Sequence, residues 1–547
     1  MRMYFRSRRR SFAFIGASLV SCGLSGVALA QDAASKTGAD TSATGAAATD
    51  STTGAAPAGE VNPQELVDKG EAALKAGDFQ AALATFTDLV RAAQQQAQSG
   101  SPDATRAVMI GLIGRGRALA GLKEYEAALE EFKQVLDSDG TFLPALIARG
   151  TVYNDINQSE LALTDFQAAA KVDRGNLEAQ FGLGKALAAL NQADAAIIPL
   201  TRVITADPKN AEALRLRATG YAGTFKTQKA IEDLNQAISL NPDDYEAYFT
   251  LGVVHLRDEK YQEAVDALNK AIEHYKPKEG QEDVPYLQGY LTEASAYIEL
   301  GKSIKDDAAA RKAAYQASVD VCEKVYKQLD TKNPQYAPYR AAVLFSRGVA
   351  ERMLGDYSSA IRTFSEAIEL NPEMGDAYFR RGICFHLLGE DKMAVSDFEQ
   401  AAHISYDDPR SQLWAGFTYS KMGDYHKALR AYGDAIAASD RYTPAYANRA
   451  LAYWALGEYD KAIADINEAI RLDPTKAEYY YKRGVAYEKL KDYKKASESL
   501  ATAIEFDKKH AGAYRHMAVV MKALDRPQLA VEYQQKADEL APPKKTK

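Results

Sequence analysis

The sequence predicts an all-α solenoid of about twelve or thirteen antiparallel helix pairs, and three observations carry this prediction. Alanine recurs every 34 residues in eleven in-phase copies, and a Gly or Ala lies twelve residues before each copy. Around these positions apolar residues are spaced three and four apart, as in an amphipathic helix. A fixed internal period of this length is typical of a repeat array. The periodic alanines are Ala128, Ala162, Ala196, Ala230, Ala264, Ala360, Ala394, Ala428, Ala462, Ala496 and Ala530.

The charge and the cysteine content exclude several classes of protein. The 547 residues carry a net charge of -7, and a chain that starts at Gln31 carries -12, because residues 1–30 hold five Arg and no acid. Such an acidic balance argues against nucleic-acid binding, which needs a basic surface to neutralise phosphates. Three Cys exclude a disulfide scaffold, and seven scattered His leave little for a metal site.

Residues 1–30 are expected to be an export signal. A basic start, MRMYFRSRRR, precedes an apolar run, and Ala30 stands before Gln31 where a signal peptidase would cut. An alternative is lipid anchoring, since the residues up to Cys22 resemble a lipobox, although residues 23–30 stay mostly apolar. Arg9-Arg10 resembles a twin-arginine signal, a weak feature in an Arg-rich start. We therefore expect a periplasmic or secreted protein with no transmembrane segment after cleavage, or alternatively a membrane-anchored lipoprotein.

Residues 31–60 are expected to be a disordered linker. They are rich in Ala, Thr and Gly and contain no aromatic residue and no Leu, Ile or Val. Such a segment cannot bury enough apolar surface to offset the entropy of ordering it. It would connect the export signal to the folded repeats.

Two runs of repeats follow: an N-terminal arm over residues 61–276 and a C-terminal arm over residues 341–542. Each unit is expected to form two helices joined by a tight turn, such as Gly355-Asp356-Tyr357, where glycine tolerates the left-handed backbone that ends the first helix. Prolines such as Pro372 close units, because proline cannot continue a helix.

These units resemble the tetratricopeptide repeat, with small residues at positions 8, 20 and 27, an aromatic at 17 and proline at 32. The resemblance covers nearly all of residues 63–542, and the Arg-led signal is similar to bacterial ones, so we expect an exported bacterial member. It implies a right-handed superhelix whose concave face, lined by the first helix of each unit, holds a peptide or partner protein. Units begin near Pro63, Met109, Leu143, Leu177, Ala211, Tyr245, Ala341, Gly375, Pro409, Thr443, Ala477 and Ala511.

The period breaks in two places. About twelve extra residues, including QQQAQSGSPD, separate the first two units. Residues 277–340 are expected to form a degenerate, lengthened helix pair that bends or kinks the solenoid between its two arms. The last residues, 543–547, read PKKTK and are expected to be a frayed basic tail.

Arginine and acid co-occur within the units. Seven units have Arg at position 7, and five of these have an acid sixteen residues later, whereas units with Leu183, Leu251 or Ala415 at position 7 do not. We therefore expect Arg–carboxylate bridges between the two helices of a unit or between neighbours; the alternative is that both charges are merely solvated. The five pairs are Arg115 with Glu131, Arg149 with Asp165, Arg217 with Asp233, Arg381 with Asp397 and Arg449 with Asp465.

Nothing in the sequence predicts catalysis, a metal or a cofactor. There is no P-loop, HExxH or CxxC, and the His residues do not converge on a nucleophile or a metal set. After signal cleavage only Cys322 and Cys384 remain, on apolar helix faces, so buried free thiols are expected rather than a disulfide. We expect a protein that is not an enzyme.

The partner site follows from the resemblance. In the family, positions 5, 9, 12 and 13 of the first helix point into the groove, which in the C-terminal arm implies an apolar and aromatic stripe. For each single residue the alternative is packing against the next unit. The N-terminal arm is more polar there, with Lys185 and Arg215 among its residues. The stripe consists of Phe345, Val349, Phe379, Ile383, Leu413, Phe417, Leu451, Trp454, Tyr481 and Val485.

The expected function is a non-catalytic scaffold or adaptor, exported from the cytoplasm, that binds a peptide or helix in this groove during envelope assembly or secretion. One alternative is a self-assembling structural component, although the polar last unit favours a cap. Another is an enzyme or cofactor binder with a site in residues 277–340.

Overall fold

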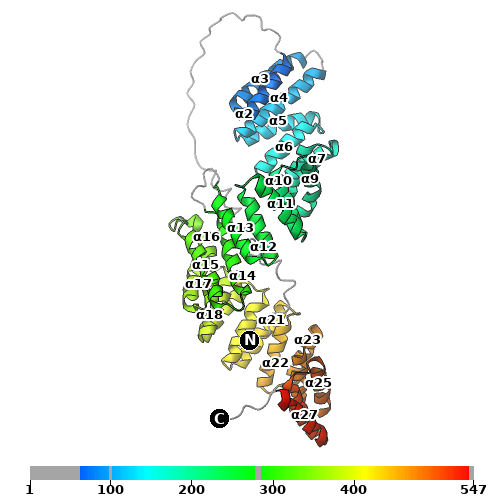
Figure 1. Ribbon diagram of the computed structural model, residues 1–547, viewed down its shortest axis with the longest axis vertical. Coiled ribbons are helices and arrows are strands. Elements are labelled where there is room, and N and C mark those ends of the chain that lie inside the picture. Colours follow the sequence, from blue (N-terminus) through cyan, green and yellow to red (C-terminus); the bar gives the residue numbers. More distant parts are fainter. Residues whose placement is uncertain (1–61, 98–101, 278–284, 541–547) are drawn as a thin grey trace, which may run out of the picture. The chain divides into compact units, whose positions relative to one another are not determined.

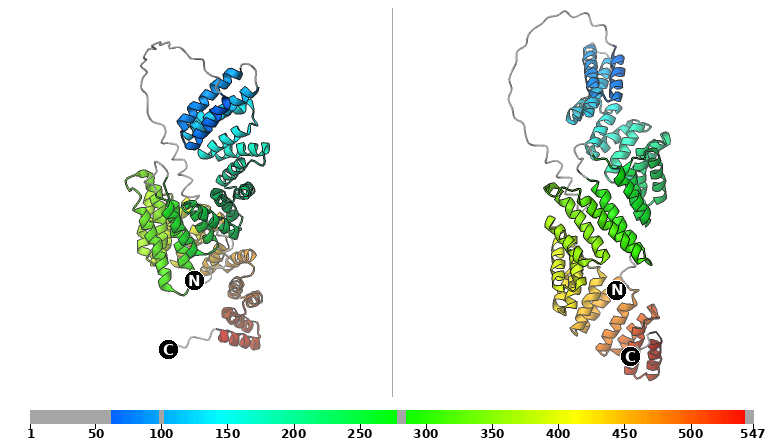
Figure 2. Two further views of the ribbon diagram at one scale, coloured as in Figure 1. Left: turned by 45° about the horizontal axis from the view of Figure 1, so that its top comes forward. Right: turned by 60° about the vertical axis from the view of Figure 1, so that its left-hand side comes forward.

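The computed structural model describes residues 62–97, 102–277 and 285–540, which form 26 α-helices, one 3₁₀-helix and no strand. Consecutive helices stack side by side as antiparallel pairs (Figure 1), and both further views show the same stacking within each run of helices (Figure 2). The prediction of an all-α solenoid of helix pairs is confirmed. The predicted export signal with Cys22, the linker and the basic tail lie outside the described residues.

The contacts between helices divide the chain into two compact units, the first of which ends at Lys276. In this first unit the helices are α2 (Pro63–Ala76), α3 (Phe79–Ala97), α4 (Pro102–Gly121), α5 (Tyr125–Ser138), α6 (Leu143–Asp155), α7 (Ser159–Val172), α8 (Leu177–Ala189), α9 (Ala193–Ala206), α10 (Ala211–Gly223), α11 (Thr227–Leu240), α12 (Tyr245–Arg257) and α13 (Tyr261–His274).

The second unit starts at Pro277. Its helices are α14 (Leu287–Ser303), α15 (Ala308–Tyr326), η1 (Pro334–Tyr336), α16 (Ala337–Leu354), α17 (Tyr357–Leu370), α18 (Gly375–Leu388), α19 (Asp391–Ile404), α20 (Pro409–Lys421), α21 (Tyr425–Ala438), α22 (Thr443–Ala455), α23 (Tyr459–Leu472), α24 (Ala477–Lys489), α25 (Tyr493–Phe506), α26 (Ala511–Ala523) and α27 (Pro527–Leu540).

The two breaks in the period are absorbed by longer helices. The extra residues between the first two repeats extend α3 to 19 and α4 to 20 residues, against 13 or 14 in most other helices. In the second break, α14 has 17 and α15 has 19 residues. The expected bend of the solenoid at this break stays a prediction.

Small residues bring the two helices of a repeat into contact. At Gly382 of α18 an added Cβ would lie 2.8 Å from the ring of Phe398 in α19, which is closer than a real Cβ contact. Phe398 is fully buried, as are residues sixteen positions after other small residues at position 8, such as Phe364 and Leu268. Such small-to-large contacts recur along the core, except in the last repeat, where the exposed Gln534 follows Ala518 by sixteen positions.

The turn between the two helices is left-handed at the same point of each repeat except the lengthened pair α14–α15. Gly355, Gly389, Gly423 and Gly457 have φ between 77° and 84°, which confirms the role expected for glycine there. Other repeats place a side chain in this conformation, including the bulky Phe225 with φ 58°. The turn geometry is thus set by the repeat rather than by the residue.

The five predicted Arg–carboxylate pairs all form, each between the first and second helices of one repeat. Their N–O distances are 2.7 to 2.8 Å, and the carboxylates are largely buried. The two arginines without a matching acid find other partners: Arg347 pairs with Glu323 and Glu351, and Arg483 donates to Ser499 and Asn467. The alternative of merely solvated charges is thereby excluded.

Candidate functional site

The first helices of the second unit share one face, which we call the inner face. α14 packs against α16, α16 against α18, α20 against α22 and α24 against α26. No pair of second helices packs to a comparable extent within the described residues. Because the first helices lie closer together than the second ones, the array curves toward them, and their free side chains face a shared concave surface.

Position 9 of six successive first helices forms an apolar row along this face. Three of its members are exposed although they are large and apolar: Phe417 by 46%, Leu451 by 44% and Val519 by 49%. The others are half-buried or, at Val485, buried. Val519 was not among the predicted site residues, although it follows Val485 by one period of 34. The apolar row consists of Val349, Ile383, Phe417, Leu451, Val485 and Val519.

The predicted residues at position 5 are less accessible. Phe379 and Leu413 are buried in the core of the second unit, and Phe345 is half-buried. Arginines from the next first helix cover two of the rings: Arg380 lies 5.3 Å from the centre of the Phe345 ring, and Arg410 lies 5.3 Å from that of Phe379. These side chains therefore pack between repeats, the alternative that the sequence left open for each single residue.

Phe417 stands in an aromatic group. His386 of the preceding first helix lies 5.5 Å from it and Trp414 lies 5.9 Å from it, measured between ring centres. His386 Nδ1 is 3.0 Å from Asp391, and burial lowers the pKa of His386, so the neutral ring is favoured. The sequence prediction missed Trp414, because position 6 is not a groove position in the family pattern.

Trp454 and Tyr481, also predicted, are half-buried against the core of the last repeats. Trp454 packs edge-on against Tyr459, with 5.0 Å between the ring centres. Tyr481 lies 4.5 Å from His510, which bonds Glu478, and this bond raises the pKa of His510. Only part of each of these two aromatic side chains is therefore accessible on the inner face.

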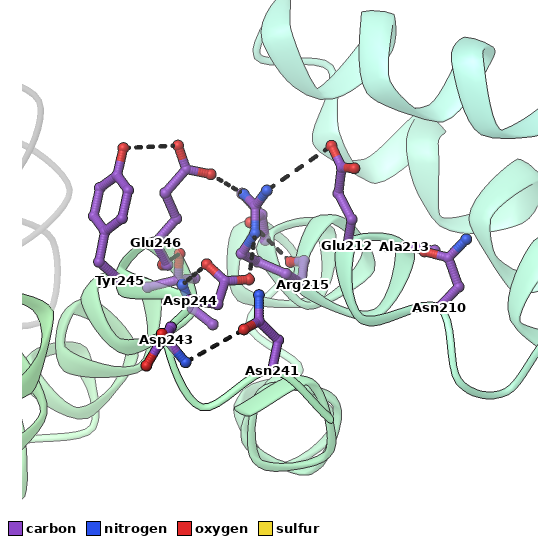
Figure 3. A network of polar contacts seen from close by, with 12 residues as sticks. Asn210, Glu212, Ala213, Arg215, Asn241, Asp243, Asp244, Tyr245 and Glu246 are labelled. Carbon is purple, nitrogen blue, oxygen red and sulfur yellow. Dashed lines mark hydrogen bonds and ion pairs between the residues drawn. The ribbon is translucent and has the colours of Figure 1, made fainter. Parts of the chain in front are cut away.

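The first unit has a polar cavity of about 370 Å³ between α10, α12 and the end of α13. Figure 3 shows Arg215 at its centre with Asp244 and Glu246, whose oxygens lie 3.2 and 2.6 Å from the guanidinium. Glu212 lies 4.0 Å from it, and the nearby Asp243 pairs with His274 and Lys276. The charges of this cavity satisfy one another within the first unit.

Family sequence models cover more than half of the chain. A model described as tetratricopeptide repeat matches residues 67–141, 147–211, 216–279 and 345–409, and a second with that description matches residues 477–510. A third, described as TPR repeat, matches residues 452–491. The chain is a tetratricopeptide repeat protein. Proteins of this family are typically non-catalytic scaffolds for protein–protein interaction, and the fold of this chain is consistent with that role.

Several solved tetratricopeptide repeat structures resemble parts of this protein. The crystal structure of MamA is 23% identical over 31% of this chain and 94% of its own, with a TM-score of 0.30. That of YrrB, a TPR protein with an unusual peptide-binding site, is 20% identical over 33% and 93%, with a TM-score of 0.30. The Cut9–Hcn1 hetero-tetramer of the APC/C is 15% identical over 80% and 94%, with a TM-score of 0.32. At such identities a likeness concerns the fold alone. No curated protein matches this chain.

The described part of this tetratricopeptide repeat protein contains no helix long and apolar enough to cross a membrane. Nor do its described residues include a group of three or more side chains that could hold a metal ion. Cys322 and Cys384 are buried free thiols, as expected, and burial raises their pKa values to about 12 and about 11. Neither thiol is therefore suited to act as a nucleophile.

Proposed function

We propose that this protein is an exported, non-catalytic adaptor that binds an extended or helical segment of a partner protein on the inner face of its second unit. Its tetratricopeptide repeat fold supports protein–protein interaction in general. The specific site is the apolar row, and the setting is envelope assembly or secretion in the periplasm or beyond it.

The exposure of the row carries the proposal. Phe417, Leu451 and Val519 come from three different first helices, yet each leaves nearly half of its surface in water. Burying the exposed half of such a side chain contributes about 1 kcal/mol, before the cost of ordering the partner. An apolar strip of this kind on a concave helical face fits the apolar side of a peptide or helix.

The sequence of residues 1–60 supports export. A basic start, an apolar run and a small residue before Gln31 form the pattern of a cleaved signal, followed by a polar linker. Mass spectrometry of the protein from its natural source tests this: we expect a mature chain that begins at Gln31. An acylated Cys22 at the new end would instead indicate a lipoprotein, and an intact Met1 would overturn export.

The binding proposal is tested with a charge variant and a matched control. Phe417→Glu combined with Leu451→Glu places two charges in the row, whereas Met393→Glu combined with Val531→Glu places them on exposed positions of the second helices α19 and α27. Both variants of the full-length chain should remain as helical as the parent by circular dichroism. Cross-linked partners from the native envelope should be lost with the row variant and retained with the control.

A partner that is retained equally by the parent and both variants would overturn the proposal. A partner lost equally with both variants would also overturn it, because the loss would then follow from charge rather than from the inner face.

A further inference from the structure

Three arginines gather on successive first helices of the second unit: Arg352 on α16, Arg380 on α18 and Arg410 on α20. Arg380 stacks over Phe345, and Arg410 over Phe379, so both guanidinium groups lie against the inner-face aromatics. Burial, together with the positive charges of Arg352 and Arg410, lowers the pKa of Arg380 to about 10, although the negative charge of Asp376 opposes this shift. The cluster therefore holds three like charges close together, and burial affects Arg380 among them.

Two of the three arginines in the cluster form no ion pair among the described residues. Arg410 forms ion pairs with two nearby acids, Asp408 at 2.6 Å and Asp376 at 3.4 Å. Among the described residues, neither Arg352 nor Arg380 forms an ion pair, and the buried Nε atom of each has no hydrogen-bond partner. Arg352 makes one weak contact, from Nη2 to the sulfur of Met353 at 3.5 Å.

The arginines at position 7 of the same helices provide the contrast. Arg381, the neighbour of Arg380 in the chain, donates to both oxygens of Asp397 at 2.8 Å and to Ser365 at 2.8 Å. This fold can thus satisfy a guanidinium where that group has a structural role. Leaving a cation buried without a partner is costly, so Arg352 and Arg380 are placed for an anion that comes from outside.

Other side chains of the inner face that form no ion pair are also positively charged. Lys489, Arg515 and Lys522 are exposed and form no ion pair among the described residues. The two acids on the last two first helices, α24 and α26, are engaged, since Glu478 bonds His510 and Glu488 bonds His516. Although the whole chain is acidic, the uncompensated charge along this face is positive, which complements an acidic partner.

We infer that Arg352 and Arg380 bind the carboxylate of an Asp or Glu side chain that lies within the partner segment covering the apolar row. This inference rests on the function proposed above and adds the chemistry of the partner: an apolar segment with an internal acid. Paired guanidinium groups hold a carboxylate with charge-assisted hydrogen bonds. The apolar row begins beside the pair, with Val349 on α16, and continues past Phe417 on α20. The acid is therefore placed where the segment covers α16 and α18, and we assign it to a side chain rather than to the end of the chain.

The experiment uses an array of synthetic 15-residue peptides with amidated C-termini, applied to the full-length chain and to three variants. Arg380→Gln removes one cation, Arg352→Gln removes the other, and Arg362→Gln removes an exposed arginine of α17, which donates only to Ser359. Melting curves establish that each variant is folded. The best binders are then remade with their acid changed to the matching amide.

We expect the parent chain and Arg362→Gln to select peptides with an internal acid between apolar residues, and the acid-to-amide change to weaken binding at least tenfold. For Arg380→Gln and Arg352→Gln, the same acid-to-amide change should weaken peptide binding less than threefold, because these variants lack one of the guanidinium groups that bind the carboxylate. A cost of the same size on all four proteins would overturn the inference, as would peptides that bind only with a free C-terminal carboxylate.

The failure of the broader proposal would look different. If peptide binding survives Phe417→Glu, the row is not the site and the proposed function falls. If Phe417→Glu abolishes peptide binding but the acid-to-amide change does not weaken binding to the parent chain, the apolar row remains the proposed site. Only the assignment of Arg352 and Arg380 is then overturned.

Discussion

Arg381 donates from Nε and Nη2 to the two carboxylate oxygens of Asp397, both at 2.8 Å, and from Nη1 to Ser365 of the preceding repeat at 2.8 Å. A single guanidinium thus connects α17, α18 and α19. Arg217 repeats this arrangement with Asp233 and Thr201. The position-7 arginines therefore hold neighbouring repeats together as well as the two helices of one repeat.

Removing only one partner of the Arg381–Asp397 pair should lower the stability of the fold. Asp397→Ala leaves the Arg381 guanidinium, whose side chain is largely buried, without its counter-ion and should lower stability by about 3 kcal/mol. Native-state hydrogen exchange of the α18 amides measures the loss. The double variant Arg381→Leu with Asp397→Ala recreates the combination of Leu251 and Ala267 in another repeat and should regain most of the stability. A double variant no better than the single one would contradict this account.

Phe225 offers a stabilising substitution. It has φ 58° in the left-handed turn after α10, and its side chain is 88% exposed, so it gains little from packing in return for the strained backbone. Phe225→Gly should stabilise the first unit by about 1 kcal/mol, because the left-handed conformation costs other L-residues about 1–2 kcal/mol. Urea unfolding measures the change. Asn191→Gly is the control, since Asn tolerates this conformation and should show a much smaller gain.

Gly382 and Phe398 should be coupled. Gly382→Ala places a Cβ 2.8 Å from the Phe398 ring and should cost about 1–3 kcal/mol through overpacking. Two repeats with alanine at position 8 have an aliphatic residue sixteen positions later: Ala218 with Leu234, and Ala450 with Ile466.

These repeats indicate that a smaller, aliphatic residue at position 398 would make room for the alanine of Gly382→Ala. In the background of Phe398→Leu, the same change should cost clearly less than in the parent, as measured by a double-mutant cycle on the urea midpoint. Strictly additive costs would show that the two positions do not share this contact.

The buried Glu293 should make the stability of the second unit depend on pH. Burial in α14 raises its pKa from about 4.5 to about 7, opposed only by the nearby Lys324. Since the folded state holds the proton more tightly than the unfolded state, stability is lost as the pH rises from about 4.5 to about 7, by an amount on the order of 3 kcal/mol.

Glu293→Gln keeps the shape of the side chain without the ionisable group. The variant should match the parent near pH 4.5 and exceed it in urea midpoint above pH 7. Glu366→Gln, at an exposed position of α17, should not change the pH profile. A parent and a Glu293→Gln variant with parallel profiles would refute the assignment.

The repeat, the helix pairs and the Arg–carboxylate pairs could all be predicted from the sequence alone. This was possible because each unit contacts only its neighbours, so the partner of Arg381 or of Gly382 lies at a fixed offset of sixteen residues. The family pattern likewise located the first helices, and with them the inner face.

Which inner-face side chains are exposed could not be predicted from the sequence, because it depends on packing between repeats. Phe417 and Val485 occupy the same position of their repeats, yet one is exposed and the other is buried among the side chains of the last repeats. Phe379 is covered by Arg410, and Arg380 is left without a counter-ion because Arg410 takes the nearby acids. These outcomes depend on the side chains that the next repeat contributes, and no pattern within a single repeat specifies them.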